Sequence, residues 1–296
     1  MLGAAAGGGF PQWNCACSNC RRARSGDVAA RPRTQCSLAV SADGERWCLL
    51  NASPDLRPQI EATPALQPQQ GPRHSPIEAV VLTNGDIDAI AGLLHLREGQ
   101  PLAIHATHPV LAALEANPVF DILARNLVRR VPLELERTVE LGQGLAVEAF
   151  AVPGKVALYL EEGVPEIGAE TGDTVGLRVA SAGRDFFFVP SCAGLTPALA
   201  ARLAGAELVL FDGTVYHDDE IIRIGAGSKS GRRMGHMSVA GPEGSLAAFA
   251  DLAVARKVYV HVNNTNPILL DDAPERAVVA AAGWEVAHDG LEIALP

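Results

Sequence analysis

The stretch EAVVLTNGDIDAIAGLLHLREG, residues 78–99, contains an apolar strand, a polar loop and a helix in direct succession. The run EAVVLTN has the composition of a buried β-strand, and the apolar spacing after Asp88 predicts a helix that ends at Gly99. The NGDID loop between them carries Asp86 and Asp88. Loops at strand ends in layered α/β folds are where functional sites converge. This stretch therefore predicts an α/β fold with a candidate site in the NGDID loop.

The same alternation of strands and helices continues through the rest of the chain. We expect strands in 36–42, 45–52, 101–107, 131–141, 146–154, 155–162, 175–191, 206–213 and 256–264, a closing hairpin in 284–295, and helices in 54–66, 109–117, 195–205, 241–255 and 271–283. Strand-rich segments in each half, with helices between them, predict one domain over residues 1–296 in which two packed mixed sheets are flanked by helices.

The composition excludes several classes of protein. Hydrophobic residues make up 48% of the 296 residues, which excludes a disordered chain and leaves enough apolar side chains for a large core. The net charge of −10 argues against a nucleic-acid partner, since such proteins usually carry a basic face. No apolar run approaches the roughly 18 residues of a membrane span, and the N-terminus lacks the features of a signal peptide. We expect a cytoplasmic protein without a membrane partner.

Three of the six cysteines, Cys15, Cys17 and Cys20, stand together in QWNCACSNC. In a reducing compartment such a cluster is typical of metal ligands, because closely spaced thiolates can supply three of the four soft ligands of a tetrahedral zinc ion. The loop at 15–20 therefore predicts a structural zinc site. The fourth ligand stays open between Cys36, a distant histidine and Asn264, and the alternative is three reduced, inert cysteines.

Long motifs spread over the whole chain resemble one known family. They are LGAAAGGGFPQWNCACSNC, the NGDID loop, VPGKVALYLE, FDGTVYHDDE, GHMSVAGPEGS and HVNNTNPIL. Together they resemble the pyrroloquinoline quinone (PQQ) biosynthesis protein B family, which has the metallo-β-lactamase fold. The resemblance implies an αββα sandwich, a structural zinc on the clustered cysteines, and an iron-dependent hydroxylation of the tyrosine ring of a Glu-Tyr precursor. An older description of this family is transport of the cofactor or its precursor.

The main metal motif of the superfamily, H-x-H-x-D-H, falls on Asn84, Asp86, Asp88 and Ala89. Asp88 keeps the residue type of the motif, whereas Asn84 and Asp86 replace its first two histidines. A two-zinc hydrolase needs imidazoles there to hold a water-activating ion, so this sequence disfavours zinc hydrolysis. Ala89 stands where the family normally has a histidine. Without the resemblance, the NGDID loop could equally be an Asx-rich turn that caps the next helix.

The resemblance implies that Asp88 and His261 are ligands of an active-site iron. Non-haem iron that reacts with dioxygen is typically held by two histidines and one carboxylate. The second imidazole is missing at Ala89, and Asp86 or Cys192 is the candidate for the missing donor. The alternatives are a hydrogen-bonded core histidine for His261 and a buried neutral thiol for Cys192.

Three further residues are candidates for chemistry. Asp212 and His236 resemble an acid/base pair of the superfamily's tRNA-processing branch, in which a carboxylate holds an imidazole in one tautomer; the alternative for each is a loop cap. Asp86 is the third candidate catalytic residue. Lys155 falls where the superfamily has a metal histidine, and an ammonium cannot bind metal. It could bind a substrate carboxylate or be a surface lysine.

Two hypotheses follow. The first is an iron- and dioxygen-dependent hydroxylase of a small peptide or amino-acid-derived PQQ precursor, with Zn²⁺ in a structural site and Fe²⁺ in the active site. The second is a non-catalytic carrier of PQQ or its precursor, which Ala89 favours because it removes a metal ligand. A homodimer is an open alternative to a monomer, and His105 and His108 are expected to be solvent-exposed and to have no role.

Overall fold

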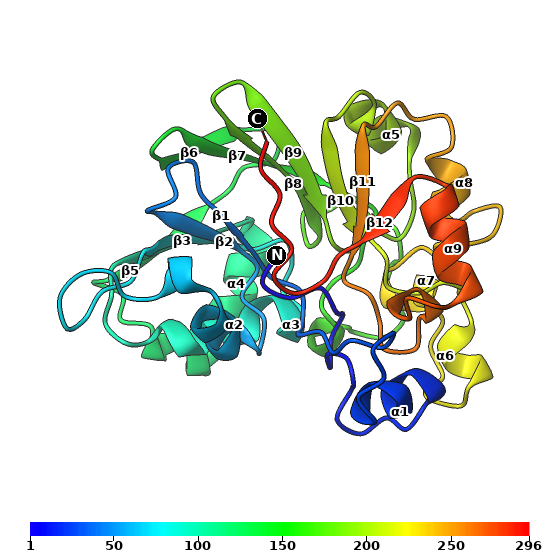
Figure 1. Cartoon of the computed structure of the whole chain (residues 1–296). Coiled ribbons are helices and arrows are strands. Elements are labelled where there is room, and N and C mark those ends of the chain that lie inside the picture. The colour runs from blue at the N-terminus through cyan, green and yellow to red at the C-terminus, as the bar shows by residue number, and fades with distance from the viewer. Residues whose placement is uncertain (296) are drawn as a thin grey trace.

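Two β-sheets packed face to face form the centre of the molecule in the computed structural model, which describes residues 1–295 (Figure 1). The first sheet has the order β1-β2-β3-β4-β5, in which β1 is antiparallel to β2 and the following neighbours pair in parallel. Its strands are β1 (Leu38–Val40), β2 (Trp47–Leu50), β3 (Ile77–Val81), β4 (Leu102–Ala106) and β5 (Val128–Pro132).

The second sheet has the order β12-β11-β10-β9-β8-β7-β6. Its half from β12 to β9 is parallel, and its half from β9 to β6 is antiparallel. Its strands are β6 (Thr138–Gly142), β7 (Leu145–Ala151), β8 (Val175–Ser181), β9 (Arg184–Val189), β10 (Leu208–Asp212), β11 (Arg256–Val260) and β12 (Trp284–Val286). Both sheets are mixed, as predicted.

Helices cover the outer face of each sheet (Figure 1). The α-helices are α1 (Ser18–Arg24), α2 (Leu56–Ala62), α3 (Ile87–Ile90), α4 (His108–Ala116), α5 (Pro197–Leu203), α6 (Glu220–Arg223), α7 (Gly231–Met234), α8 (Ser245–Ala248) and α9 (Pro274–Ala281). Short 3₁₀ helices are η1 (Pro64–Leu66), η2 (Ala91–Leu96), η3 (Pro118–Ile122), η4 (Leu158–Leu160) and η5 (Pro267–Leu269).

Three apolar layers account for this arrangement. The middle layer joins the two sheets, with Leu50 and Val81 from the first sheet against residues such as Leu177 and Val258 from the second. A second layer lies between the first sheet and α2, α3, η2 and α4, and a third lies between the second sheet and α5, α8 and α9. A sheet whose two faces are both buried must be covered on each side, so the αββα sandwich follows from the apolar strands. This fold class is confirmed.

Several predicted element boundaries were wrong. The expected strand at 155–162 contains η4 instead, and the expected hairpin at 284–295 supplies only β12, which pairs in parallel with β11. The expected helix at 241–255 is reduced to α8, which begins after its N-cap residue Gly244.

The N-terminal segment runs between the two sheets and reaches the candidate site. Ala5 forms bridges both to Gln35 and to Val262, which follows β11. Further along, Gly7 approaches Asp88 so closely that a Cβ atom on Gly7 would lie 3.3 Å from the Oδ2 atom of Asp88. No helix within residues 1–295 combines the length and the apolar character that crossing a membrane requires.

Candidate active site and cysteine cluster

A cavity of about 430 Å³ opens where the loops after β3, β10 and β11 meet. This volume is in the range of small-molecule sites. The sequence-predicted residues that line it come from distant parts of the chain; they are Asn84, Asp86, Asp88, Lys155, His236 and His261. The structure therefore brings most of the predicted site residues to one place.

Asp88 and His261 are in direct contact. The Nε2 atom of His261 lies 2.8 Å from the Oδ2 atom of Asp88. Burial disfavours the charge on each side chain, but the hydrogen bond and the opposite charge outweigh it, so the pKa of Asp88 is lowered and that of His261 is raised. His261 directly follows β11 with φ of 56°, a conformation that non-glycine residues rarely adopt. Backbone strain of this kind persists only where surrounding contacts hold it, and it clusters at functional sites.

Asp212, at the end of β10, holds the second imidazole of the site. Its Oδ2 atom lies 2.7 Å from Nδ1 of His236 and accepts a hydrogen bond from the backbone N–H of Cys192. This contact assigns the Nδ1 proton to His236 and leaves its Nε2 atom as the basic nitrogen when the ring is neutral. The predicted Asp212–His236 pair is therefore present as a geometric unit. The ring of His236 also stacks on that of His261, with 5.2 Å between centroids.

Thr214 connects the two imidazoles. Its Oγ1 atom lies 2.6 Å from Oδ1 of Asp212, 2.8 Å from Nδ1 of His261 and 3.1 Å from Nδ1 of His236. Asp212 can only accept, so the hydroxyl donates to it and accepts the Nδ1 proton of His261. The backbone oxygen of His261 lies 2.9 Å from the same hydroxyl oxygen and competes with Asp212 for its single proton.

Asp212, His236 and His261 include the donor set that non-haem iron prefers, with ligand atoms within 4.8 Å of one another. However, the Thr214 hydroxyl lies among these atoms at hydrogen-bond distances, so the space that an ion would need is filled. The contact between Asp88 and His261 is a hydrogen-bonded ion pair at 2.8 Å. Two ligand atoms about 2.1 Å from one ion and at right angles to each other are about 3.0 Å apart, so these two atoms are close enough to bind one ion in place of the shared proton.

Ala89 supplies no third protein ligand beside Asp88 and His261. Its methyl group is buried in the apolar layer between the first sheet and its helices. Asp86 lines the same cavity, and burial together with the charge of Asp88 raises the pKa of its carboxyl. Asp88 and His261 thus offer one carboxylate and one imidazole, which is one imidazole fewer than the usual set, and Asp86 is a further carboxyl group in the lining of the same cavity.

The structure decides between the alternatives that the sequence left open for Lys155 and Cys192. The Nζ atom of Lys155 is 3.0 Å from Oε1 of Glu161 and the side chain is almost fully buried, so Lys155 is not a surface lysine. The thiol of Cys192 donates to the backbone oxygen of Gly194, and burial raises its pKa to about 12. Among the described residues (1–295), Cys192 is not one of those that line the cavity. These contacts favour a buried neutral thiol over a metal ligand at Cys192.

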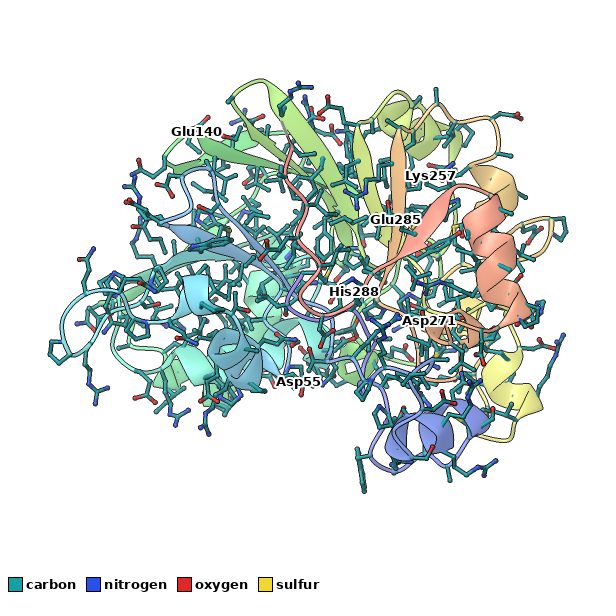
Figure 2. The ribbon with its side chains drawn as sticks, viewed as in Figure 1. Asp55, Glu140, Lys257, Asp271, Glu285 and His288 are labelled. Atoms are coloured by element: carbon teal, nitrogen blue, oxygen red, sulfur yellow. The ribbon has the colours of Figure 1, made fainter. Side chains whose placement is uncertain are left out.

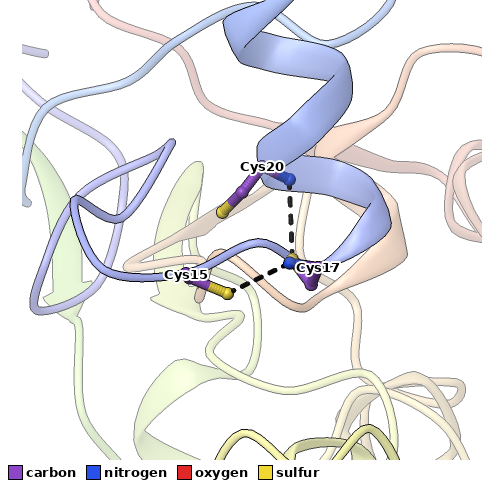
Figure 3. A group of neighbouring side chains, drawn as sticks. All are labelled: Cys15, Cys17 and Cys20. Carbon is purple, nitrogen blue, oxygen red and sulfur yellow. Dashed lines mark hydrogen bonds between the residues drawn. The ribbon is translucent and has the colours of Figure 1, made fainter.

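The three clustered cysteines lie at the start of α1, with their sulfur atoms within 4.8 Å of one another (Figure 3). The side-chain nitrogen of Asn264 lies 3.3 Å from Sγ of Cys20 and 3.8 Å from Sγ of Cys17. The amide of Asn264 therefore donates hydrogen bonds to the cluster, and only its oxygen atom could serve as a fourth ligand. Cys36 does not belong to this group of converging sulfur atoms, and its thiol lies against the backbone of His261.

Some residues of the site carried no signal in the sequence. Thr214 and Tyr159 are of common types, and neither belongs to a spacing pattern; Tyr159 donates to the backbone oxygen of Gly85 at 2.9 Å. Outside the site, the prediction that His105 is solvent-exposed is wrong. It lies within β4, where both neighbouring strands cover it, and burial lowers its pKa to about 4.

Comparison with known proteins identifies the family. Residues 46–262 match the beta-lactamase superfamily domain. Over 295 residues the chain is 56% identical to "Coenzyme PQQ synthesis protein B" of Methylorubrum extorquens, a match that covers 100% of this chain and 99% of the relative. The chain belongs to the coenzyme PQQ synthesis protein B family. The same-named protein of Gluconacetobacter diazotrophicus is 55% identical, with 99% of this chain and 98% of the relative covered. The resemblance predicted from the motifs is confirmed.

Solved structures agree with this assignment. The crystal structure of Zn²⁺-bound PqqB from Methylobacterium extorquens has a TM-score of 0.98 and 56% identity, and it covers 99% of this chain and 98% of that chain. A diphosphatase from the PhnP family has a TM-score of 0.69 at 19% identity, covering 98% of this chain and 93% of that chain. At that identity the second match shows the fold alone.

Proposed function

We propose that this protein acts in the biosynthesis of coenzyme PQQ, as an iron- and dioxygen-dependent hydroxylase of the tyrosine ring of a Glu-Tyr-derived precursor. The observation that carries this proposal is the contact between Nε2 of His261 and Oδ2 of Asp88 in the wall of a ligand-sized cavity. Family membership supports the pathway. The geometry of the pair supports the metal, since both atoms converge as two ligands of one ion would.

Asp88 and His261 would hold the iron, with Asp86 as a further carboxyl group in the cavity lining. A bound iron would supply the activation of dioxygen. The hydrogen bond from Nδ1 of His261 to Thr214 leaves Nε2 as its metal-binding nitrogen, which is the arrangement that ligating histidines usually have. Asp212 accepts the Nδ1 proton of His236, so Nε2 is the basic nitrogen of the neutral ring and can accept a phenolic proton from a ring placed in the cavity.

The overall reaction defines what must be added. A ring C–H bond is replaced by C–O–H; one oxygen atom of dioxygen enters the ring and the other leaves as water. Two protons and two electrons are consumed, so the reaction needs an external reductant. Ascorbate is a suitable reductant for an assay.

The test is product formation by the full chain. Protein loaded anaerobically with one equivalent of Fe²⁺ is mixed with Glu-Tyr and ascorbate and then exposed to oxygen. We expect a product heavier by one oxygen atom for the parent and for Asp121→Asn, an exposed aspartate far along the chain from the site. Asp88→Asn should form none. No product from the parent at stoichiometric iron would refute the proposal.

For the cysteine cluster we propose a structural zinc ion held by Cys15, Cys17 and Cys20. Three thiols with mutually close sulfur atoms support it, as does the Zn²⁺ in the crystal structure of the relative from Methylobacterium extorquens. Asn19 packs this loop against the segment after β11, because its amide donates to the backbone oxygens of Asn264, Thr265 and Asn266. A zinc ion there would fix the segment that positions His261.

The second candidate is a non-catalytic carrier of PQQ or its precursor. The buried methyl group of Ala89 favours it, since the fold and cavity are retained while one ligand position lacks a donor. Titration of metal-free protein with PQQ separates the two proposals. Tight binding that is unchanged by iron, with no hydroxylated product, supports the carrier, whereas binding that requires iron contradicts it.

A further inference from the structure

One cationic side chain of the cavity has no anionic partner. Of the two lysines that line the cavity, Lys155 is paired with Glu161 and also donates to the backbone oxygen of Val156. Lys229 is half-buried, and within residues 1–295 its ammonium forms neither an ion pair nor a hydrogen bond. Removing part of the water around a charge without a partner is unfavourable, so a ligand that supplies the opposite charge is favoured there.

Helix α7 holds Lys229 in this position. Ser230 caps the helix, with its Oγ atom accepting from the backbone N–H of Arg233 at 3.2 Å. Next to it, Gly231 packs so tightly that a Cβ atom would lie 2.4 Å from Cγ2 of Val215. At the other end of α7, Gly235 lies against the stem of Lys155. The helix therefore places Lys229 and Lys155 on one wall of the cavity.

Cationic side chains gather near α7. Arg233 donates two hydrogen bonds to Glu161, at 3.1 and 2.7 Å, and Lys155 uses the same carboxylate. Two cations therefore share the carboxylate of Glu161, and Lys229 adds an unpaired ammonium to the cavity lining. The lining also contains Asp86, whose carboxyl accepts from the backbone N–H of Leu158, and Asp88, which is paired with His261.

We propose that Lys229 determines the specificity of the cavity by binding a carboxylate of the ligand, so that the ring of the ligand extends toward Asp88 and His261. The identity of that ring rests on the function proposed above, whereas the preference for a carboxylate rests on the unpaired ammonium of Lys229 in the cavity lining. Lys155 contributes its positive charge, but its ammonium group is already paired with the carboxylate of Glu161.

The test measures binding and requires neither iron nor turnover. Titration calorimetry on the full chain compares Glu-Tyr with glutaminyl-tyrosinamide, which has a similar shape and no carboxylate. The parent should prefer Glu-Tyr by about 10- to 100-fold, the range for a hydrogen bond to a charged group. Lys229→Met should abolish this preference, and Lys229→Arg should retain most of it. The control is Lys257→Met, the third lysine of the chain, at the start of β11 and so at the opposite end of that strand from His261 (Figure 2).

Each outcome decides between the proposals. An unchanged preference in Lys229→Met, or a parent that binds both dipeptides equally or neither, overturns the role of Lys229. Loss of preference in Lys229→Met but not in Lys257→Met supports it, even if the parent forms no hydroxylated product; that result would refute the hydroxylase alone.

Discussion

The Nε2 atom of His261 lies 2.8 Å from the Oδ2 atom of Asp88, although 173 positions separate the two residues in the sequence. Asp88 stands in α3 after a strand of the first sheet, and His261 directly follows a strand of the second sheet. The contact therefore exists only because the two sheets pack with these strand ends at the same edge. The proposed iron site depends on this junction.

Replacing Ala89 by histidine should raise the affinity for iron. The new imidazole would stand next to Asp88 in the position where the family normally has one, and so provide the second nitrogen of the usual donor set. We expect iron content to rise toward one ion per chain by elemental analysis after anaerobic loading and desalting.

The control for this variant is Ala89→Leu, which adds bulk to the same buried position without a donor. Overpacking alone should cost about 1–3 kcal/mol of stability in both variants. Equal iron content in Ala89→His and the parent would show that the assigned pair does not bind iron.

Replacing Thr214 by valine should destabilise the folded protein by about 1–3 kcal/mol, because a buried carboxylate oxygen and an imidazole nitrogen each lose a partner. Thr214→Ser keeps the hydroxyl and should cost much less. Urea unfolding of both variants, monitored by circular dichroism, measures the difference. If valine and serine are equally tolerated, the hydroxyl does not connect Asp212 to His261.

Replacing Cys20 by alanine should abolish zinc binding at the cysteine cluster. With one of three thiolates gone, the site loses a ligand that is fully buried and cannot be replaced by water at similar affinity. Zinc measured by mass spectrometry should fall from about one per chain to a small fraction of that. Cys48→Ala, a buried cysteine of β2, should retain zinc even if it loses stability; full zinc content in Cys20→Ala would contradict the assignment.

His105 should make stability depend on pH. Its pKa is about 4 in the folded protein, below the ordinary value near 6.5, because burial disfavours the charged ring. Its contribution to the free energy of unfolding is therefore fully present above about pH 6.5 and is lost as the pH falls toward 4. In this range the ring of His105 becomes protonated in the unfolded chain but stays neutral in the folded protein. Between pH 7 and pH 5 the loss should be about 1–2 kcal/mol.

The measurement is the free energy of unfolding in urea at pH 7 and pH 5 for the parent and for His105→Gln. The variant has no titrating group at this position, so its stability should change less across the interval. If the stability of the parent and of the variant changes equally between pH 7 and pH 5, the ring of His105 takes up a proton as readily in the folded protein as in the unfolded chain.

The sequence alone was sufficient for features that local pattern encodes. Apolar runs and glycine positions indicated most of the strands, although the strand expected at 155–162 and the hairpin expected at 284–295 were wrong. The spacing of Cys15, Cys17 and Cys20 marked one candidate metal cluster, and the long motifs identified the family. The NGDID loop was found because strand, loop and helix are contiguous there. Each of these signals is read within a few residues along the chain.

Only the tertiary structure decided which side chains meet. It joined Asp88 to His261, gave Thr214 its place between two imidazoles, paired Lys155 with Glu161 and turned the thiol of Cys192 away from the cavity. Such contacts depend on how the two sheets and their loops pack, and packing is a collective property of residues more than 100 positions apart in the case of Asp88 and His261. Local periodicity carries no information about that distance, which is why the roles of single residues had to await the fold.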